Sequence, residues 1–183
     1  MRAFIAAEIP EITKKTLLEI QGQFQQKGIK GQWIKPDQMH LTLVFFKQIN
    51  SFQARQTSFT LKNQPHPIPF HFNLGHPNIF LAHNKPRVLW INLEGKVAEM
   101  ILWTNRLRQE LKNKKIPFDQ KTFVPHLTLA RFYRPPKNLL ETLEQVTVKK
   151  KPFTIKQVSL FKSKLAPAGS SYSLISKISL TPS

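Results

Sequence analysis

Two histidines of this sequence stand in the same four-residue setting. The tetrapeptide His-Leu-Thr-Leu begins at His40 and again at His126, in a chain that has six histidines in all. Side chains two positions apart in a β-strand point to the same face, so His40 would share a face with Thr42, and His126 with Thr128. The leucines would then point to the opposite face, toward a core.

Such a pair of histidines is suited to displacement at phosphorus. An imidazole exchanges a proton near neutral pH, because its unperturbed pKa is about 6.5. Two rings on opposite sides of one atom can serve as base and acid, each contributing roughly 10²–10⁴-fold. A threonine hydroxyl two residues on could donate to a non-bridging phosphate oxygen. The repeat could also arise because strands use few residue types, and spacing alone does not decide between these interpretations.

The other four histidines fall within 18 residues of the sequence: His66, His71, His76 and His83. Their spacing matches no familiar pattern of metal ligands, acidic residues are absent nearby, and the chain has no cysteine. The sequence also lacks a glycine-rich phosphate loop and a Gly-x-Ser-x-Gly elbow. We therefore expect no metal and no cofactor.

The charge of the chain suggests a phosphate-bearing partner. Lysine and arginine total 28 against 10 aspartate and glutamate residues, a formal net charge of +18. Self-repulsion on this scale destabilises the compact state, so a polyanion such as nucleic acid is expected to bind. The alternative is a cytoplasm whose proteins are basic in general. Charge alone names no reaction.

Length and composition favour a single domain that spans residues 1–183, built either as one unit or as two closely packed lobes. Hydrophobic residues make up 40% of the 183, enough for a globular core. The absence of cysteine agrees with a reducing compartment. The apolar stretch after Arg2 is interrupted at Glu8, so it is too short for a signal peptide or a membrane span. We expect a soluble, cytoplasmic protein without membrane association.

Hydrophobic patterning predicts strands and helices that do not alternate regularly. The predicted helices cover 11–27, 96–114 and 139–146, and the predicted strands cover 2–9, 39–46, 67–74, 78–82, 87–93, 122–132, 153–163 and 171–180. The last two strands would form a hairpin across Pro167 to Ser171. This order favours an α+β fold with antiparallel sheets. A helix precedes each His-x-Thr strand, which indicates a weak internal duplication and two similar lobes.

With these motifs, the chain resembles the 2H phosphoesterase superfamily and, within it, the RNA 2′,3′-cyclic phosphodiesterases, historically called 2′-5′ RNA ligases. The resemblance lies in five stretches in the family's order: MRAFIAAEIP, WIKPDQMHLTLVFF with Trp33 and Pro36, KPRVLWINL, FVPHLTLARF with Pro125 and Arg131, and LFKSKLAPAGSSYSLI. One departure is that the first motif ends in Phe46 and Lys47 where the family usually has Leu and Gly, so Lys47 stands in place of the family's glycine. It puts the loop conformation and the substrate preference in doubt.

The resemblance implies a bilobal fold with pseudo-twofold symmetry, in which the two His-x-Thr strands face each other across a central groove. It implies metal-independent hydrolysis of a 2′,3′-cyclic phosphate, on RNA or on a nucleoside, to a 2′-phosphate. His126 would activate water as the base, and His40 would protonate the departing 3′-oxygen. In a symmetric site the two histidines could also exchange these roles. Thr42 and Thr128 would hold the phosphate oxygens.

Three further residues carry open alternatives. Arg131 lies five residues after His126, hence on the opposite face of a regular strand. It reaches the phosphate only if a bulge or strand end re-aims it, and is otherwise a surface arginine. Tyr172 either borders the groove and stacks on a base, or packs within the hairpin. Lys47 changes the turn after its strand and could bring charge to the groove rim.

Two other functions fit the same residues. The enzyme could run the reverse reaction, joining a cyclic phosphate end to a 5′-hydroxyl, although water at about 55 M favours hydrolysis. The chain could also be a non-catalytic, basic RNA-binding module, against which the intact histidines and threonines argue. The expected partner in each case is RNA, or a cyclic nucleotide for the enzyme, and we expect a monomer.

Overall fold

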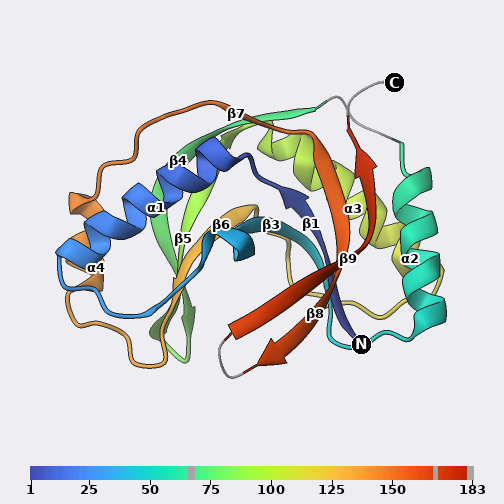
Figure 1. Ribbon diagram of the computed structural model, residues 1–183, viewed down its shortest axis with the longest axis horizontal. Helices are drawn as coiled ribbons and strands as arrows, with labels where there is room; N and C mark the ends of the chain where they lie inside the picture. The colour runs from blue at the N-terminus through green and yellow to red at the C-terminus, as the bar shows by residue number, and fades with distance from the viewer. Residues whose placement is uncertain (66–68, 167–168, 181–183) are drawn as a thin grey trace.

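The structure is a computed structural model that describes residues 1–65, 69–166 and 169–180. Two antiparallel sheets form its centre within the described residues (Figure 1). The strands are β1 (Arg2–Glu8), β2 (Gln32–Trp33), β3 (His40–Phe46), β4 (Phe70–Ala82), β5 (Lys85–Gly95), β6 (His126–Arg131), β7 (Phe153–Ile155), β8 (Gln157–Ala166) and β9 (Gly169–Ser179). The helices are α1 (Glu11–Gln26), η1 (Pro36–Gln38), α2 (Ser51–Asn63), α3 (Val97–Asn113) and α4 (Leu139–Gln145).

Each sheet contains one of the two His-x-Thr strands. The first sheet has the order β3-β1-β8-β9, and the second has the order β2-β6-β5-β4-β7. β3 and β6 contact each other, which brings the two motifs together although they are far apart in sequence. Buried side chains of both sheets belong to one continuous hydrophobic cluster. The predicted α+β, bilobal fold is confirmed.

The helices cover the sheets in a crossed arrangement. α1 follows a strand of the first sheet but packs against the second, where the Gln21 side chain donates to the Leu129 carbonyl of β6 at 2.9 Å. α3 follows a strand of the second sheet and contacts β3 of the first, while α2 contacts β9. Figure 1 shows α1 and α4 on one side of the molecule and α2 and α3 on the other. No helix among the described residues is long and apolar enough to cross a membrane.

The predicted break at Gly75 is wrong, because β4 runs continuously from Phe70 through Ala82. The pairing of β4 with β5 shifts register between Leu74 and Pro77, and this bulge accommodates a proline that has no N–H to donate. Gly75 is required by close packing, since a Cβ there would lie 2.1 Å from Oδ1 of Asn92. Residues 67 and 68 of the predicted strand lie outside the described residues.

The predicted strand over 153–163 is divided between the two sheets. β7 pairs with β4 in the second sheet, and β8 pairs with β1 and β9 in the first. Lys156 lies between them, so this segment connects the sheets. The hairpin of β8 and β9 is confirmed, while Pro167 and Ala168 of its predicted turn lie outside the described residues. β6 begins only at His126, four residues later than predicted, after Pro125.

Helix α2 was not predicted from the sequence. Its buried positions are Ala54, Thr57, Thr60 and Leu61, of which only Leu61 is a large apolar residue. The hydroxyls of the two threonines donate to carbonyls one turn back, which satisfies them inside the helix. The missed signal was the capping box, in which the side chains and backbones of Asn50 and Gln53 bond reciprocally.

Candidate active site

A groove of about 740 Å³ lies between the two sheets and brings all six predicted site residues together. His40 and Thr42 reach it from β3, His126, Thr128 and Arg131 reach it from β6, and Tyr172 reaches it from β9. Each His-x-Thr pair projects from one strand face, as the two-residue period requires, and the intervening Leu41 and Leu127 are buried. The groove therefore offers two imidazoles and two hydroxyls to one ligand.

Each motif strand has a bulge just after its threonine. In β3 the pairing moves from Thr42 to Val44, which leaves Leu43 as the extra residue. In β6 it moves from Thr128 to Ala130, which leaves Leu129 as the extra residue. Two consecutive side chains after each threonine are therefore buried, and the next one returns to the groove.

The bulge in β6 brings Arg131 to the groove face, while its contact with a phosphate stays a prediction. Five positions separate it from His126, which in a regular strand would place the two on opposite faces, yet both line the groove. The equivalent position in β3 is Phe45, which also lines the groove. The two halves of the site are thus similar in backbone but differ in chemistry, with a cation on one side and an aromatic ring on the other.

The carbonyl of Leu129, freed at the bulge, is satisfied by two donors. It accepts from Nε2 of Gln21 at 2.9 Å and from the backbone N–H of Ile34 at 2.9 Å. Gln21 is buried in α1, and the same nitrogen donates to the carbonyl of Ile34. This helix side chain therefore holds the bulge that aims Arg131 into the groove.

His40 lies against two aromatic rings in a half-buried position. Its ring stacks on Phe4, with centroids 4.7 Å apart and an interplanar angle of 20°, and meets the edge of Tyr172 at 5.5 Å. The pKa of His40 is lowered from 6.5 to about 4, chiefly by burial and also by the charges of Arg131 and His126, while a hydrogen bond to the backbone of Gln38 acts in the opposite direction. His40 is consequently neutral at pH 7 in the free protein.

His126 has an analogous environment in the second sheet. Its ring contacts Phe80 at 4.9 Å and Trp90 at 5.6 Å, both edge-on. Burial lowers the pKa of His126, Arg131 contributes in the same direction, and the hydrogen bond to the backbone of Val124 opposes both.

The ring orientation of His126 indicates which nitrogen is available for chemistry. Nδ1 lies 2.6 Å from the carbonyl oxygen of Val124, and a carbonyl can only accept a hydrogen bond. We infer that Nδ1 carries the proton of the neutral ring, which leaves Nε2 as the proton acceptor. A neutral His126 can therefore act as a base through Nε2.

Arg131 is the electrostatic centre of the groove. Its charge lowers the pKa of His40, of His126 and of Tyr172, so it lies near all three groups. The side chain is exposed and forms no hydrogen bond or ion pair with another described residue. A planar cation with free donors beside two histidines is suited to binding the oxygens of a phosphate.

Tyr172 packs on a neighbouring ring and also borders the groove, while its stacking on a base stays a prediction. It packs edge-on against Phe4 at 4.8 Å and also lines the groove. Burial raises its pKa, although Arg131 and a hydrogen bond to Ser170 act in the opposite direction. Its phenol is therefore neutral at pH 7 and can offer a donor at the groove wall.

Sequence reasoning missed other residues of the groove wall. Arg2 lines the groove with its guanidinium carbon 5.0 Å from the ring centroid of Phe45. Phe4 lies two residues along the same strand face. The two-residue period of a strand could have placed Phe4 on the face of Arg2, although Phe4 is itself buried and the burial of β1 does not alternate there.

The remaining expectations have mixed outcomes. Lys47 is exposed just after β3 and is not among the described residues that line the groove, so its effect at the groove rim stays a prediction. His71 lies in a strand and His83 lies between β4 and β5, as the predicted strands imply, whereas His76, between two predicted strands, lies within β4. In the described parts of the chain, no three histidine, aspartate or glutamate side chains are grouped to hold a metal ion. His66 lies outside the described residues.

Comparisons with known proteins agree with this geometry. A family model described as LigT like Phosphoesterase matches residues 8–90 and 94–172, and each stretch contains one His-x-Thr pair. The chain is 30% identical over 180 residues to the RNA 2′,3′-cyclic phosphodiesterase of Methanocaldococcus jannaschii, covering 96% of this chain and 98% of that protein. It is 28% identical over 176 residues to the RNA 2′,3′-cyclic phosphodiesterase of Thermotoga maritima, covering 96% and 93%.

The fold also has a counterpart among solved structures. The crystal structure of TT0787 of Thermus thermophilus superposes with a TM-score of 0.82 at 25% identity, covering 98% of both chains. Motifs, fold and family model therefore agree, and the chain belongs to the LigT-like phosphoesterase family of the 2H superfamily.

Proposed function

We propose that this protein is a metal-independent RNA 2′,3′-cyclic phosphodiesterase that produces a 2′-phosphate. The observation that carries the proposal is the convergence of two His-Thr pairs and Arg131 on one groove from two separate sheets. The family membership and the names of two relatives, both RNA 2′,3′-cyclic phosphodiesterases, support the same reaction. Phosphate transfer needs little more than positioned acid–base groups and charge stabilisation.

In this mechanism the two histidines act on opposite ends of the reacting bond system. His126 accepts a proton from a water molecule through Nε2, and the water oxygen attacks phosphorus. The bond between phosphorus and the 3′-oxygen breaks, and His40 donates a proton to that oxygen as it departs. The products are a 3′-hydroxyl and a 2′-phosphate, so no metal and no second reactant besides water is needed.

The other groove residues hold the charge that develops on phosphorus. Thr42 and Thr128 donate from opposite strands to the two non-bridging oxygens. Arg131 supplies a cation with several donors to the same oxygens, which stabilises the transition state more than the ground state. Tyr172 borders the nucleoside and offers its phenol as a further donor.

The low pKa of His40 places a condition on its role as acid. With a pKa of about 4 in the free protein, His40 is uncharged near neutral pH and cannot donate a proton. A cyclic phosphate is anionic, and an anion bound beside the ring favours the imidazolium form. His40 therefore acquires its proton in the complex, so substrate binding itself prepares the acid.

The test is hydrolysis of a short RNA with a 2′,3′-cyclic phosphate end in the presence of excess EDTA. Wild type, His40→Ala and His126→Ala are compared, and the product phosphate is mapped to the 2′ or the 3′ position. We expect turnover to a 2′-phosphate that each substitution reduces by roughly 10²–10⁴-fold. Loss of wild-type turnover in EDTA would refute metal independence.

The same assay separates the two rival functions. An added RNA with a 5′-hydroxyl would be joined to the cyclic end if ligation dominates, and the product would contain a 2′-5′ linkage. Folded wild-type protein that binds the RNA with a steep salt dependence and never turns it over would instead be a binding module. Either result would contradict the proposed hydrolase.

A further inference from the structure

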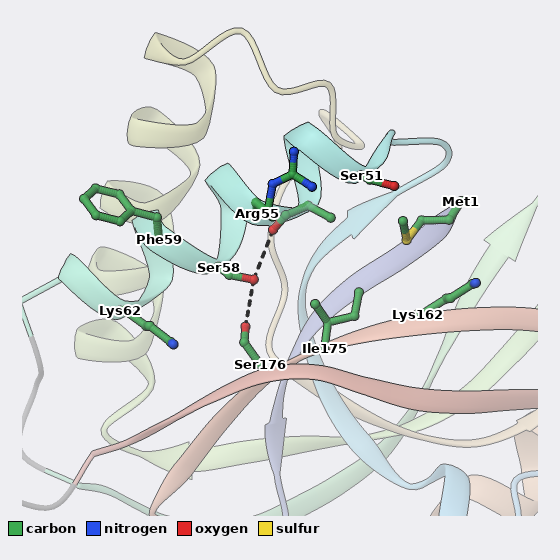
Figure 2. A pocket seen from close by; sticks show the side chains of 10 residues that line it. Met1, Ser51, Arg55, Ser58, Phe59, Lys62, Lys162, Ile175 and Ser176 are labelled. Atoms are coloured by element: carbon green, nitrogen blue, oxygen red, sulfur yellow. Dashed lines mark hydrogen bonds between the residues drawn. The ribbon is translucent and has the colours of Figure 1, made fainter.

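A second pocket lies on the opposite side of the first sheet from the groove. It has a volume of about 540 Å³ and is bounded by α2, β8, β9 and the start of β1. Figure 2 shows Arg55 on α2 and Ile175 on β9, with Lys62 toward one end of the pocket and Lys162 and Met1 toward the other.

The alternation of strand residues places this pocket and the groove on different faces of one sheet. Met1 lines the pocket while Arg2 lines the groove, and Lys162 lines the pocket while Ser163 lines the groove. Neighbouring side chains in a strand point to opposite faces. The pocket is therefore a separate site that is not part of the catalytic groove.

The pocket has three cations and no compensating acid. Arg55, Lys62 and Lys162 line it, and no aspartate or glutamate is among the described residues that do so. None of the three side chains forms a hydrogen bond or ion pair with a described protein group. Lys162 is half-exposed, and the three charges are distributed along the pocket, with Lys62 and Lys162 toward opposite ends. Such a site is complementary to an anion.

The exposed face of α2 adds aromatic rings to these charges. Phe52, Arg55, Phe59 and Lys62 are spaced by three, four and three residues, which places them on one helix face. The two phenylalanines are 59% and 61% exposed, which is unusual for rings of this size. Nζ of Lys114 lies 5.2 Å from the ring centroid of Phe59. Alternating aromatic rings and cations bind single-stranded nucleic acid by stacking and phosphate contact.

A short connection leads from the groove to this surface. Phe45 lines the groove, Ser51 lines the pocket, and Lys47 is exposed on the chain between them. Arg2 and Met1, adjacent in sequence, likewise line the groove and the pocket. Cations thus mark both ends of this route and its middle.

We propose that the pocket and the exposed face of α2 bind the upstream nucleotides of an RNA whose 3′ end occupies the groove. The cyclic end would lie between the histidines, and the strand would pass Arg2 and Lys47 to reach Arg55, Lys62 and Lys162. The inference rests on the proposed function for the identity of the 3′ end. It predicts that the pocket affects the KM of long RNA substrates, although the pocket takes no part in the chemical step.

The test compares two triple variants with equal loss of charge. The pocket variant carries Arg55→Gln, Lys62→Gln and Lys162→Gln. The control variant replaces three exposed lysines that do not line the pocket or the groove: Lys15→Gln, Lys137→Gln and Lys149→Gln. Both are assayed on a nucleoside 2′,3′-cyclic phosphate and on RNAs of increasing length that carry the same end.

We expect the pocket variant to be normal on the nucleoside and impaired on long RNA. Its KM for the long substrate should rise roughly tenfold or more at low salt with kcat unchanged, and the salt slope of RNA binding should fall by about 2 for three lost phosphate contacts. The control variant should change KM several-fold less. Equal effects of the two variants on long RNA would overturn the proposal.

Methionine methyl resonances report the site directly, because the chain has three methionines in different places. Met1 lines the pocket, Met39 precedes His40, and Met100 is buried in α3. A long RNA without a cyclic end should shift Met1, whereas a nucleoside cyclic phosphate should shift only Met39. Met100 is the internal control. This binding experiment needs no turnover, so it still tests the pocket if the proposed hydrolysis fails.

Two outcomes would assign the pocket to a different ligand. If adenosine 5′-monophosphate shifts Met1 as strongly as long RNA does and length has no effect on KM, the pocket binds a free nucleotide. If no RNA shifts Met1, the surface does not bind nucleic acid and its charge suits an acidic protein instead. Both outcomes contradict the proposed binding of upstream RNA.

Discussion

The pKa of His40 makes a quantitative prediction about stability. Burial against Phe4 and Tyr172, with Arg131 nearby, lowers this pKa from 6.5 to about 4 in the folded protein. The unfolded chain therefore binds a proton at His40 between pH 6.5 and 4 that the folded protein does not. By linkage, the contribution of His40 is complete above pH 6.5 and is lost as the pH falls through this window.

The size of this effect on the unfolding free energy follows from the change in the pKa of His40. Each pKa unit corresponds to 1.36 kcal/mol, so a change from 6.5 to about 4 corresponds to about 3 kcal/mol of unfolding free energy. Urea unfolding of wild type and His40→Asn at pH 7 and pH 4.5 measures it. The pH-dependent loss of stability should be smaller in the variant by about 2–3 kcal/mol.

The matched control is His83→Asn, which replaces an exposed histidine in the β4–β5 turn. Its unfolding free energy should depend on pH as that of wild type does. Equal pH dependence of the two variants would refute the buried, neutral state of His40. A second readout is the ring resonance of His40, whose pKa should rise by more than about one unit when a nucleoside 2′-phosphate is bound.

Three further predictions concern the groove and its supports. Because the pKa values of both histidines are lowered, kcat/KM should be greatest below pH 6.5, and kcat should be greatest at a higher pH because the bound anion raises both values. Arg131→Gln should lower kcat/KM by roughly 10²-fold, Arg131→Lys should recover part of it, and the resonances of both histidines should titrate at higher pH in the glutamine variant. Gly75→Ala, whose Cβ would lie 2.1 Å from Oδ1 of Asn92, should reduce the urea unfolding free energy by roughly 1–3 kcal/mol, whereas Gly22→Ala, with nothing within 4 Å, should raise it by about 0.5–1 kcal/mol. A kcat/KM profile centred above pH 7 would contradict the first prediction. Unchanged kcat/KM in Arg131→Gln would contradict the second, and equal changes of unfolding free energy in Gly75→Ala and Gly22→Ala would contradict the third.

The shared strand face of each histidine and its threonine was predictable from sequence because it depends on local periodicity. The two-residue period of a strand requires His40 and Thr42 to share a face, and the same holds for His126 and Thr128. The duplicated motif then indicated two similar lobes. The structure adds that the two strands contact each other and that the four side chains line one groove.

The position of Arg131 could not be predicted, because it depends on a non-local feature. The bulge at Leu129 is defined by the register with β5, a strand about 40 residues earlier, and is held by Gln21 of α1. Nothing in the local sequence of β6 specifies that one residue will be unpaired. A strand taken by itself would place this arginine on the wrong face.

Two other elements were hidden for related reasons. The break at Lys156 depends on β7 and β8 pairing with different sheets, which a continuous run of β-forming residues conceals. Helix α2 has a buried face made largely of Ala54, Thr57 and Thr60, so its apolar period is weak. Its exposed face carries the phenylalanines and cations that we assign to RNA.

The separate roles of the two histidines are tested most directly by changing the departing atom. A substrate with sulfur in place of the 3′-oxygen of the cyclic phosphate releases a thiolate, which needs no proton from an acid. We predict that His40→Ala, slow on the oxygen substrate, recovers near wild-type turnover on the sulfur substrate, while His126→Ala remains slow on both. Equal losses for both variants on the sulfur substrate, or recovery by His126→Ala alone, would contradict this assignment of acid and base.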